Sequence, residues 1–284
     1  MTEQGGVSYM DGILRISLMG GQARAFLVES THTVEHARRV HHLSHTATAA
    51  LGRTLTATAV LGAMLKGENE SVTCRIDGGG PLGLVLAVGD SSGNVKGLVA
   101  HPEVDPPRNG EKLNVGAAVG RDGMLTVVKD MRMREPYVGQ VRLRSGEIGE
   151  DFAMYFTASE QTPSLVSLGV LVGEEVISAG GLIIQMMPGA SEAAIQSIET
   201  SAGMFMDISG TLKTDHLDGA LTLKAKLGPF WLKLIPRPKK HRAPKSKKEK
   251  KPATKKQADT AEPKEKKPSP LLSGGVSGIL ELLR

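Results

Sequence analysis

Alternating apolar and polar residues near the start of the chain predict two short β-strands, over residues 13–18 and 23–29. Gly20-Gly21 separates them, as expected for a hairpin turn. The pattern then changes to a spacing of three or four residues, which predicts a helix over residues 46–66 along Ala47, Ala50, Leu51, Thr54, Leu55, Thr58, Leu61 and Leu65. Lys66-Gly67 supplies a cationic last turn and a glycine to end this helix.

Further strand-like segments follow, bounded by turn residues. They are predicted at residues 71–77, 84–88, 94–100, 124–129, 139–144, 165–172 and 176–187. Residues 101–112 are expected to form a loop, and two more helices are predicted, over residues 147–159 and from about Ser191. Strands and helices interleave without a regular βαβ repeat. The sequence therefore predicts an α+β fold, a mostly antiparallel sheet with packed helices.

The apolar pattern weakens in the last third of the chain, which divides the sequence into four regions. A core domain over residues 10–199 precedes a divergent segment, residues 200–236, in which only residues 221–227 alternate like a half-buried strand. Residues 237–270 are rich in Lys, Pro and Ala and cannot bury enough apolar surface to offset their chain entropy, so we predict a disordered basic tail. Residues 271–284 are expected to end in a short amphipathic turn.

Charge is distributed unevenly between the body and the tail. Residues 1–236 contain 20 Lys and Arg against 25 Asp and Glu, whereas residues 237–268 contain 14 against 4. Such a tail can bind nucleic acid, polyphosphate or ribosomal surfaces through counterion release, or it can only keep an aggregation-prone domain in solution. No aromatic residue interleaves its lysines, so base stacking is not expected. A polyanion-associated protein is therefore one hypothesis for the function.

Cys74, the only cysteine, lies in the alternating segment Val72-Thr73-Cys74-Arg75-Ile76 and is expected to be a buried structural thiol without a redox role. The segment Gly78-Gly79-Gly80-Pro81-Leu82-Gly83 fits the GxGxxG pattern. An extended run follows it where a phosphate-binding helix should begin, which favours a tight turn over a nucleotide site. No Walker A lysine is found either, so the sequence gives no reason to expect ATP use.

Four histidines, His36, His41, His42 and His45, cluster on a predicted helix, and His41 with His45 has the i, i+4 spacing that can hold a metal. Glu35 is the one nearby carboxylate, so solvated or capping histidines are favoured over a zinc site.

No catalytic constellation is apparent either. Ser159 and Ser164 have no base close in sequence, and Glu147, Glu150 and Asp151 fit the acidic first turn of a helix. We therefore expect no enzyme, no cofactor and no metal. No apolar run reaches the roughly 20 residues needed to cross a bilayer, and the N-terminus lacks the features of a signal peptide, so a cytosolic location is expected.

Residues 10 to about 199 closely resemble the N-terminal domain of the redox-regulated 33 kDa heat-shock chaperonins. The resemblance is carried by five segments in the same order and spacing: TATAALGRTLTATAVLGAMLKG (46–67), GGGPLG (78–83), VGRDGMLTVVKD (119–130), EPYVGQVRLRSGEIGEDFAMYFTASEQTPS (135–164) and AGGLIIQMMPGA (179–190). It implies an ATP-independent holdase that binds unfolding client proteins in a bacterial stress response. The sequence leaves open whether such a holdase is a homodimer.

The same resemblance implies a zinc switch that this chain lacks. In the family, a CxC and a CxxC pair near the C-terminus bind zinc when reduced and form disulfides when oxidised. None of these four cysteines is present, and Cys74 matches none of them. We therefore expect a constitutive holdase without zinc. The divergent C-terminal third is either a genuine tail or the product of a shifted reading frame or a fusion.

Overall fold

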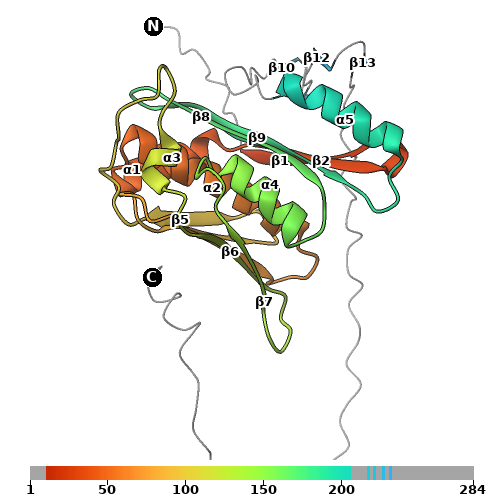
Figure 1. Cartoon of the computed structure of the whole chain (residues 1–284), viewed down its shortest axis with the longest axis horizontal. Helices are drawn as coiled ribbons and strands as arrows, with labels where there is room; N and C mark the ends of the chain where they lie inside the picture. Colours follow the sequence, from red (N-terminus) through yellow and green to blue (C-terminus); the bar gives the residue numbers. More distant parts are fainter. Residues whose placement is uncertain (1–10, 206–215, 218–219, 222–225, 228–229, 232–284) are drawn as a thin grey trace, which may run out of the picture. The chain divides into compact units, whose positions relative to one another are not determined.

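The computed structural model describes residues 11–205 and four two-residue strands beyond them, with side chains described as far as Thr200. Figure 1 shows the arrangement of its elements. The strands are β1 (Gly12–Leu18), β2 (Ala23–Glu29), β3 (Ser71–Asp77), β4 (Val85–Asp90), β5 (Val95–Val99), β6 (Met124–Asp130), β7 (Tyr137–Arg142), β8 (Ser164–Val172), β9 (Val176–Met186), β10 (His216–Leu217), β11 (Ala220–Leu221), β12 (Lys226–Leu227) and β13 (Phe230–Trp231). The helices are α1 (Thr31–His41), α2 (His45–Met64), α3 (Val115–Val119), α4 (Gly149–Ala158) and α5 (Glu192–Phe205), with a 3-10 turn at Met19–Gly21.

Two antiparallel sheets form the body of the described residues. Sheet A has the strand order β1-β2-β9-β8, and sheet B has the order β5-β4-β3-β6-β7. Strand β9 lies between β2 and β8 in sheet A, so residues near position 25 pair with residues near position 184. Strands β10 with β11, and β12 with β13, form separate short antiparallel pairs.

Helix α2 lies between the two sheets and packs against strands of both (Figure 1). Seventeen of its twenty residues are buried, because neither side of the helix faces solvent. Its composition suits that position, since Ala, Gly and Thr let both sheets come close. A Cβ atom on Gly62 would lie 2.5 Å from the carbonyl oxygen of Asp90. The hydroxyls of Thr54, Thr56 and Thr58 are satisfied inside the helix, as when Thr54 donates to the Ala50 carbonyl at 2.8 Å.

The predicted α+β class with mostly antiparallel sheet is confirmed. Each strand predicted between residues 13 and 187 is present within a few residues of its expected bounds. The predicted end of the long helix at Lys66-Gly67 is wrong, because α2 stops at Met64 and Leu65 already has an extended backbone. Helix α1 was expected only as part of the helix carrying the four histidines, without bounds of its own.

The predictions for the C-terminal regions mostly lie outside the described residues. The strand expected over residues 221–227 has its two ends in different short strands, β11 and β12, and residues 222–225 lie outside the described part of the chain. The predicted disordered tail over residues 237–270 and the amphipathic end at 271–284 also lie outside it, and the proposed domain boundaries stay predictions.

Candidate functional site

The outward-facing side of sheet A carries rows of apolar side chains that the strand register brings together. One row runs through Leu14, Leu27 and Leu182, which pair across β1, β2 and β9. The next rows extend it, since residues two apart on a strand share a face. We call the following ten residues the outer apolar face: Leu14, Ile16, Leu18, Ala23, Ala25, Leu27, Leu165, Leu182, Ile184 and Met186.

Helix α5 covers only part of this face in the described residues. Its Ile198 packs on the cluster of Ala23, Ala25 and Ile184. The segment leading into α5 is held by Gln22, whose carbonyl oxygen accepts from Met187 N at 2.9 Å. Leu14 and Leu27 keep part of their surface exposed. None of the ten residues is charged, and the nearest charge on the same side of the sheet is Glu29, at the end of β2 beyond Leu27. The uncovered part between Leu14, Leu27 and Leu182 can therefore contact other apolar groups.

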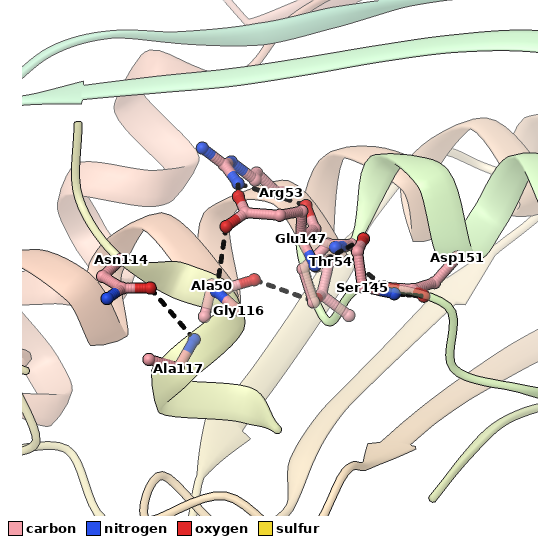
Figure 2. A network of polar contacts seen from close by, with 10 residues as sticks. Ala50, Arg53, Thr54, Asn114, Gly116, Ala117, Ser145, Glu147 and Asp151 are labelled. Carbon is pink, nitrogen blue, oxygen red and sulfur yellow. Dashed lines mark hydrogen bonds and ion pairs between the residues drawn. The ribbon is translucent and has the colours of Figure 1, made fainter. Parts of the chain in front are cut away.

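A polar network joins α2 to the segment before α4 (Figure 2). Arg53 donates from Nη1 to Glu147 Oε2 at 2.8 Å, and Glu147 Oε1 accepts from Gly116 N at 3.0 Å. Asp151 is fully buried and accepts from the backbone of Arg144 at 2.7 Å, as well as from Ser145 and Ile148. These contacts satisfy backbone groups and hold Ile148 at a positive φ of 69°, so the network is structural.

The structure corrects the expectation that Glu147 belongs to the first turn of a helix. Helix α4 begins at Gly149, and only Glu150 and Asp151 lie in its first turn. Glu147 precedes the helix and pairs with Arg53, which is 94 residues away in sequence. Spacing alone gave no sign of this long-range partner.

Ser159 and Ser164, which have no base close in sequence, also have local partners in the structure. Ser159 shares a hydrogen bond of 3.0 Å with the hydroxyl of Tyr137, and Ser164 donates to the Thr162 carbonyl at 2.8 Å. Neither contact supplies a general base.

The glycine-rich segment at 78–83 makes a turn that leads into the extended strand β4. Gly79 and Gly83 have positive φ angles of 73° and 68°. Gly80 lies so close to the end of α3 that a Cβ atom there would be 2.4 Å from the carbonyl oxygen of Ala118. Glycine is therefore required for backbone packing, and no helix N-terminus follows to bind a phosphate.

Cys74 lies in the core, fully buried on β3 between Val127 of β6 and Ala87 of β4. Burial raises the pKa of its thiol from 9.0 to about 12, opposed in part by a hydrogen bond with the Thr58 side chain. Since the thiolate is the reactive form, this environment disfavours oxidation and metal binding.

The histidine cluster is divided between two helices. His41 ends α1, His42 follows in a left-handed conformation with φ of 52°, and His45 begins α2. The i, i+4 spacing of His41 and His45 therefore does not lie along one continuous helix. His45 Nδ1 lies 3.4 Å from Asp105 Oδ2, and residues 11–205 contain no group of three or more His, Cys, Asp or Glu side chains arranged to hold a metal.

A family model described as Hsp33 protein matches residues 11–227. The chain belongs to the Hsp33 family. The 33 kDa chaperonin of Alkaliphilus metalliredigens is 52% identical over 201 residues, which cover 69% of this chain and 68% of the relative. That of Clostridioides difficile is 51% identical over 206 residues, covering 72% and 70%. The crystal structure of the 33 kDa chaperonin from Thermotoga maritima is similar at a TM-score of 0.65 and 39% identity, over 67% of this chain and 66% of that one.

The resemblance to redox-regulated members raises the question of zinc, which in them is bound by four cysteines. This Hsp33 family member has one cysteine in its whole sequence, and that residue is fully buried. A closed zinc site needs four ligands, so the donors present do not fit the four-thiolate site.

Proposed function

We propose that this chain is an ATP-independent holdase that binds unfolding proteins and prevents their aggregation. Membership of the Hsp33 family supports a chaperone role, and its curated relatives are named 33 kDa chaperonins. The observation that carries the proposal is the outer apolar face, an uncharged surface that spans the four strands of sheet A and is only partly covered by α5.

An uncharged sheet face suits a holdase because apolar contact is nondirectional and needs no particular client sequence. Each unfolding client exposes apolar side chains, and burying them against Leu14, Leu27 and Leu182 removes both surfaces from water. The free energy scales with the apolar area covered, at about 25 cal/mol per Å². Binding on this basis needs no nucleotide, which fits the use of the Gly78–Gly83 segment as a turn.

We propose further that the activity is constitutive. The redox switch of the family requires paired thiols, and the one thiol here has a pKa raised to about 12 by burial. The client surface and the thiol also lie on different sheets, with Leu27 on β2 and Cys74 on β3. Catalysis is not part of the proposal, since the family is named for chaperone action.

The central test is light scattering of a heat-unfolding client enzyme with increasing amounts of the purified chain. We expect protection that reaches its limit near equimolar chain, without ATP, and equally with and without peroxide. Leu27→Lys should abolish most of the protection, because it places a charge in the middle row of the face. Gln140→Lys, at an exposed position on β7, is the matched control and should protect like the parent. Full protection by Leu27→Lys would contradict the assignment of the face.

The competing hypothesis of a polyanion-associated protein rests on the lysine-rich tail, residues 237–268, which lies outside the described residues. The family relationship favours the chaperone instead. Among the helices of the described residues, none has the length and apolar character needed to span a membrane. A cytosolic location and a homodimeric state stay predictions.

A further inference from the structure

Strand β8 forms one edge of sheet A and differs from the other three edges of sheets A and B. The edge strands β1, β5 and β7 carry Arg15, Lys96 and Arg142, whereas the nine residues of β8, SLVSLGVLV, contain no charge and no proline. Six of the nine are Leu or Val, yet none is fully buried. Charged residues and prolines are the usual protection of an edge against pairing with another chain, so β8 is the edge of sheets A and B that lacks this protection.

The register shows which backbone groups of β8 face away from the sheet. Met186 N donates to the Pro163 carbonyl at 3.0 Å, which makes Pro163 and Met186 a hydrogen-bonded pair. In an antiparallel ladder such pairs alternate, so odd-numbered residues from Leu165 to Gly169 bond to β9. The even-numbered residues, Val166, Leu168 and Val170, therefore direct their N–H and C=O groups outward.

Two glycines beside β8 agree with this assignment of which carbonyl groups face β9 and which face outward. A Cβ atom on Gly181 of β9 would lie 2.7 Å from the Ser167 carbonyl oxygen, so that oxygen faces β9. A Cβ atom on Gly149 of α4 would lie 3.8 Å from the Val166 carbonyl oxygen, so that oxygen faces away from β9 and towards the start of α4. Helix α4 thus approaches the edge at Val166. Within the described residues, the outward groups of Leu168 and Val170 have no strand beside them.

We propose that β8 binds an extended segment of the client by β-strand addition, through the N–H and C=O groups of Leu168 and Val170. The inference rests on the proposed holdase function and deepens it. Main-chain hydrogen bonds suit a chaperone because every unfolded client can form them whatever its sequence. The preferred occupant is an uncharged segment rich in Val, Ile, Thr or aromatic residues, since its side chains would continue the outer apolar face beyond Leu165 on one side and lie beside Leu168 and Val170 on the other.

Proline substitution tests the edge, because it removes one N–H and is tolerated where that N–H faces outward. Val170→Pro should raise the concentration needed for half-maximal protection about fivefold, as expected for one lost hydrogen bond. The control for the loss of an outward N–H is Val138→Pro on the edge strand β7. The Leu143 N to Gly123 carbonyl bond of 3.0 Å makes Val138 an outward-facing position there, so the control should protect like the parent. Val138 is exposed whereas Val170 packs against the core, so the melting temperature of Val170→Pro is compared with that of the parent as well.

Amide hydrogen exchange of the unsubstituted, isotope-labelled chain gives a second readout that does not depend on a variant folding. Reduced and carboxymethylated α-lactalbumin, which stays unfolded, serves as the client. The amides of Leu168 and Val170 should exchange several-fold more slowly when it binds, while those of Leu165 and Ser167 are already protected by β9.

Three results would overturn the proposal. Normal protection by Val170→Pro, or exchange at Leu168 and Val170 that the client does not slow, means that clients do not use the edge. A change of oligomeric state in Val170→Pro with unchanged protection means that a second copy of this chain occupies β8. In all three cases Leu27→Lys still reports on the outer apolar face, so the failure of the edge and the failure of the holdase function are distinguishable.

Discussion

Alkylation of Cys74 offers a quantitative test of its burial. At pH 8 an exposed thiol with the ordinary pKa of 9.0 is about one-tenth thiolate, whereas a pKa of about 12 leaves about one thiolate in ten thousand. The structure therefore predicts that iodoacetamide reacts with the native chain at least about a thousandfold more slowly than with the unfolded chain. The side chain is also inaccessible to solvent, so alkylation requires local opening of sheet B and should be slower still.

The assay compares the rates at which mass spectrometry detects the alkylated chain in buffer and in denaturant. Cys74→Ser, which can keep a hydrogen bond with Thr58, is the control that shows no reaction at either condition. Native and unfolded rates within about tenfold of each other would refute the reasoning, because a group with a thousandfold smaller thiolate fraction cannot react that fast.

The reactivity of Cys74 also determines whether peroxide can change the chaperone activity. If Cys74 is unreactive, the parent chain and Cys74→Ser should protect a client equally before and after peroxide treatment. If peroxide raises the protection and Cys74→Ser removes that rise, the thiol is reachable. A disulfide joining Cys74 residues of two chains then becomes the leading mechanism, and the constitutive assignment is wrong.

The remaining predictions concern stability and metal content. Gly62→Ala should lower the free energy of unfolding by about 1–3 kcal/mol despite the better helix propensity of Ala, because the new Cβ collides with the Asp90 carbonyl; Gly12→Ala, with nothing within 4 Å, should be near neutral in a urea titration. Asp151→Ala should cost about 3 kcal/mol by leaving buried backbone donors unpaired, against a few tenths for the exposed Glu150→Ala, and equal losses would contradict this. Elemental analysis after dialysis should find far less zinc than chain, and a chelator should leave the melting temperature unchanged; equimolar zinc would return attention to the histidines at 36–45.

The strands and the long helix could be predicted from the sequence because their signals are local. Helix α2 was expected to have one apolar side, and its burial on every side was not foreseen. Small residues such as Gly52 and Ala57 look neutral in a helical pattern, and only contact with both sheets explains them. The helix predicted to carry the four histidines is divided between α1 and α2, and the break was not expected because His42 takes its left-handed conformation without a glycine or proline to mark it.

The outer apolar face could not be predicted, since it depends on pairing between residues more than 150 positions apart. Leu27 meets Leu182 only because β9 inserts beside β2. A weaker signal was present in the sequence. The run Leu182-Ile183-Ile184 is apolar at consecutive positions, which indicates a strand with two apolar sides. Ile183 packs in the core, and Leu182 with Ile184 forms the face outside.

The contrast between the two sheets argues for sheet A as the functional one. Both sheets pack one side against α2, so both need apolar residues on that side. On its other side, sheet B mixes polar and apolar residues at its centre, where Arg75 is paired with Thr126 on one neighbouring strand and with Leu86 on the other, and Gln140 donates to Thr126 at 3.1 Å. Sheet A carries leucines at the equivalent place. A solvent-facing sheet surface loses nothing by being polar, so the outer apolar face of sheet A, which ends at Glu29 on β2, needs a partner to account for it. An unfolding client meets that need through side chains on the face and main chain along β8.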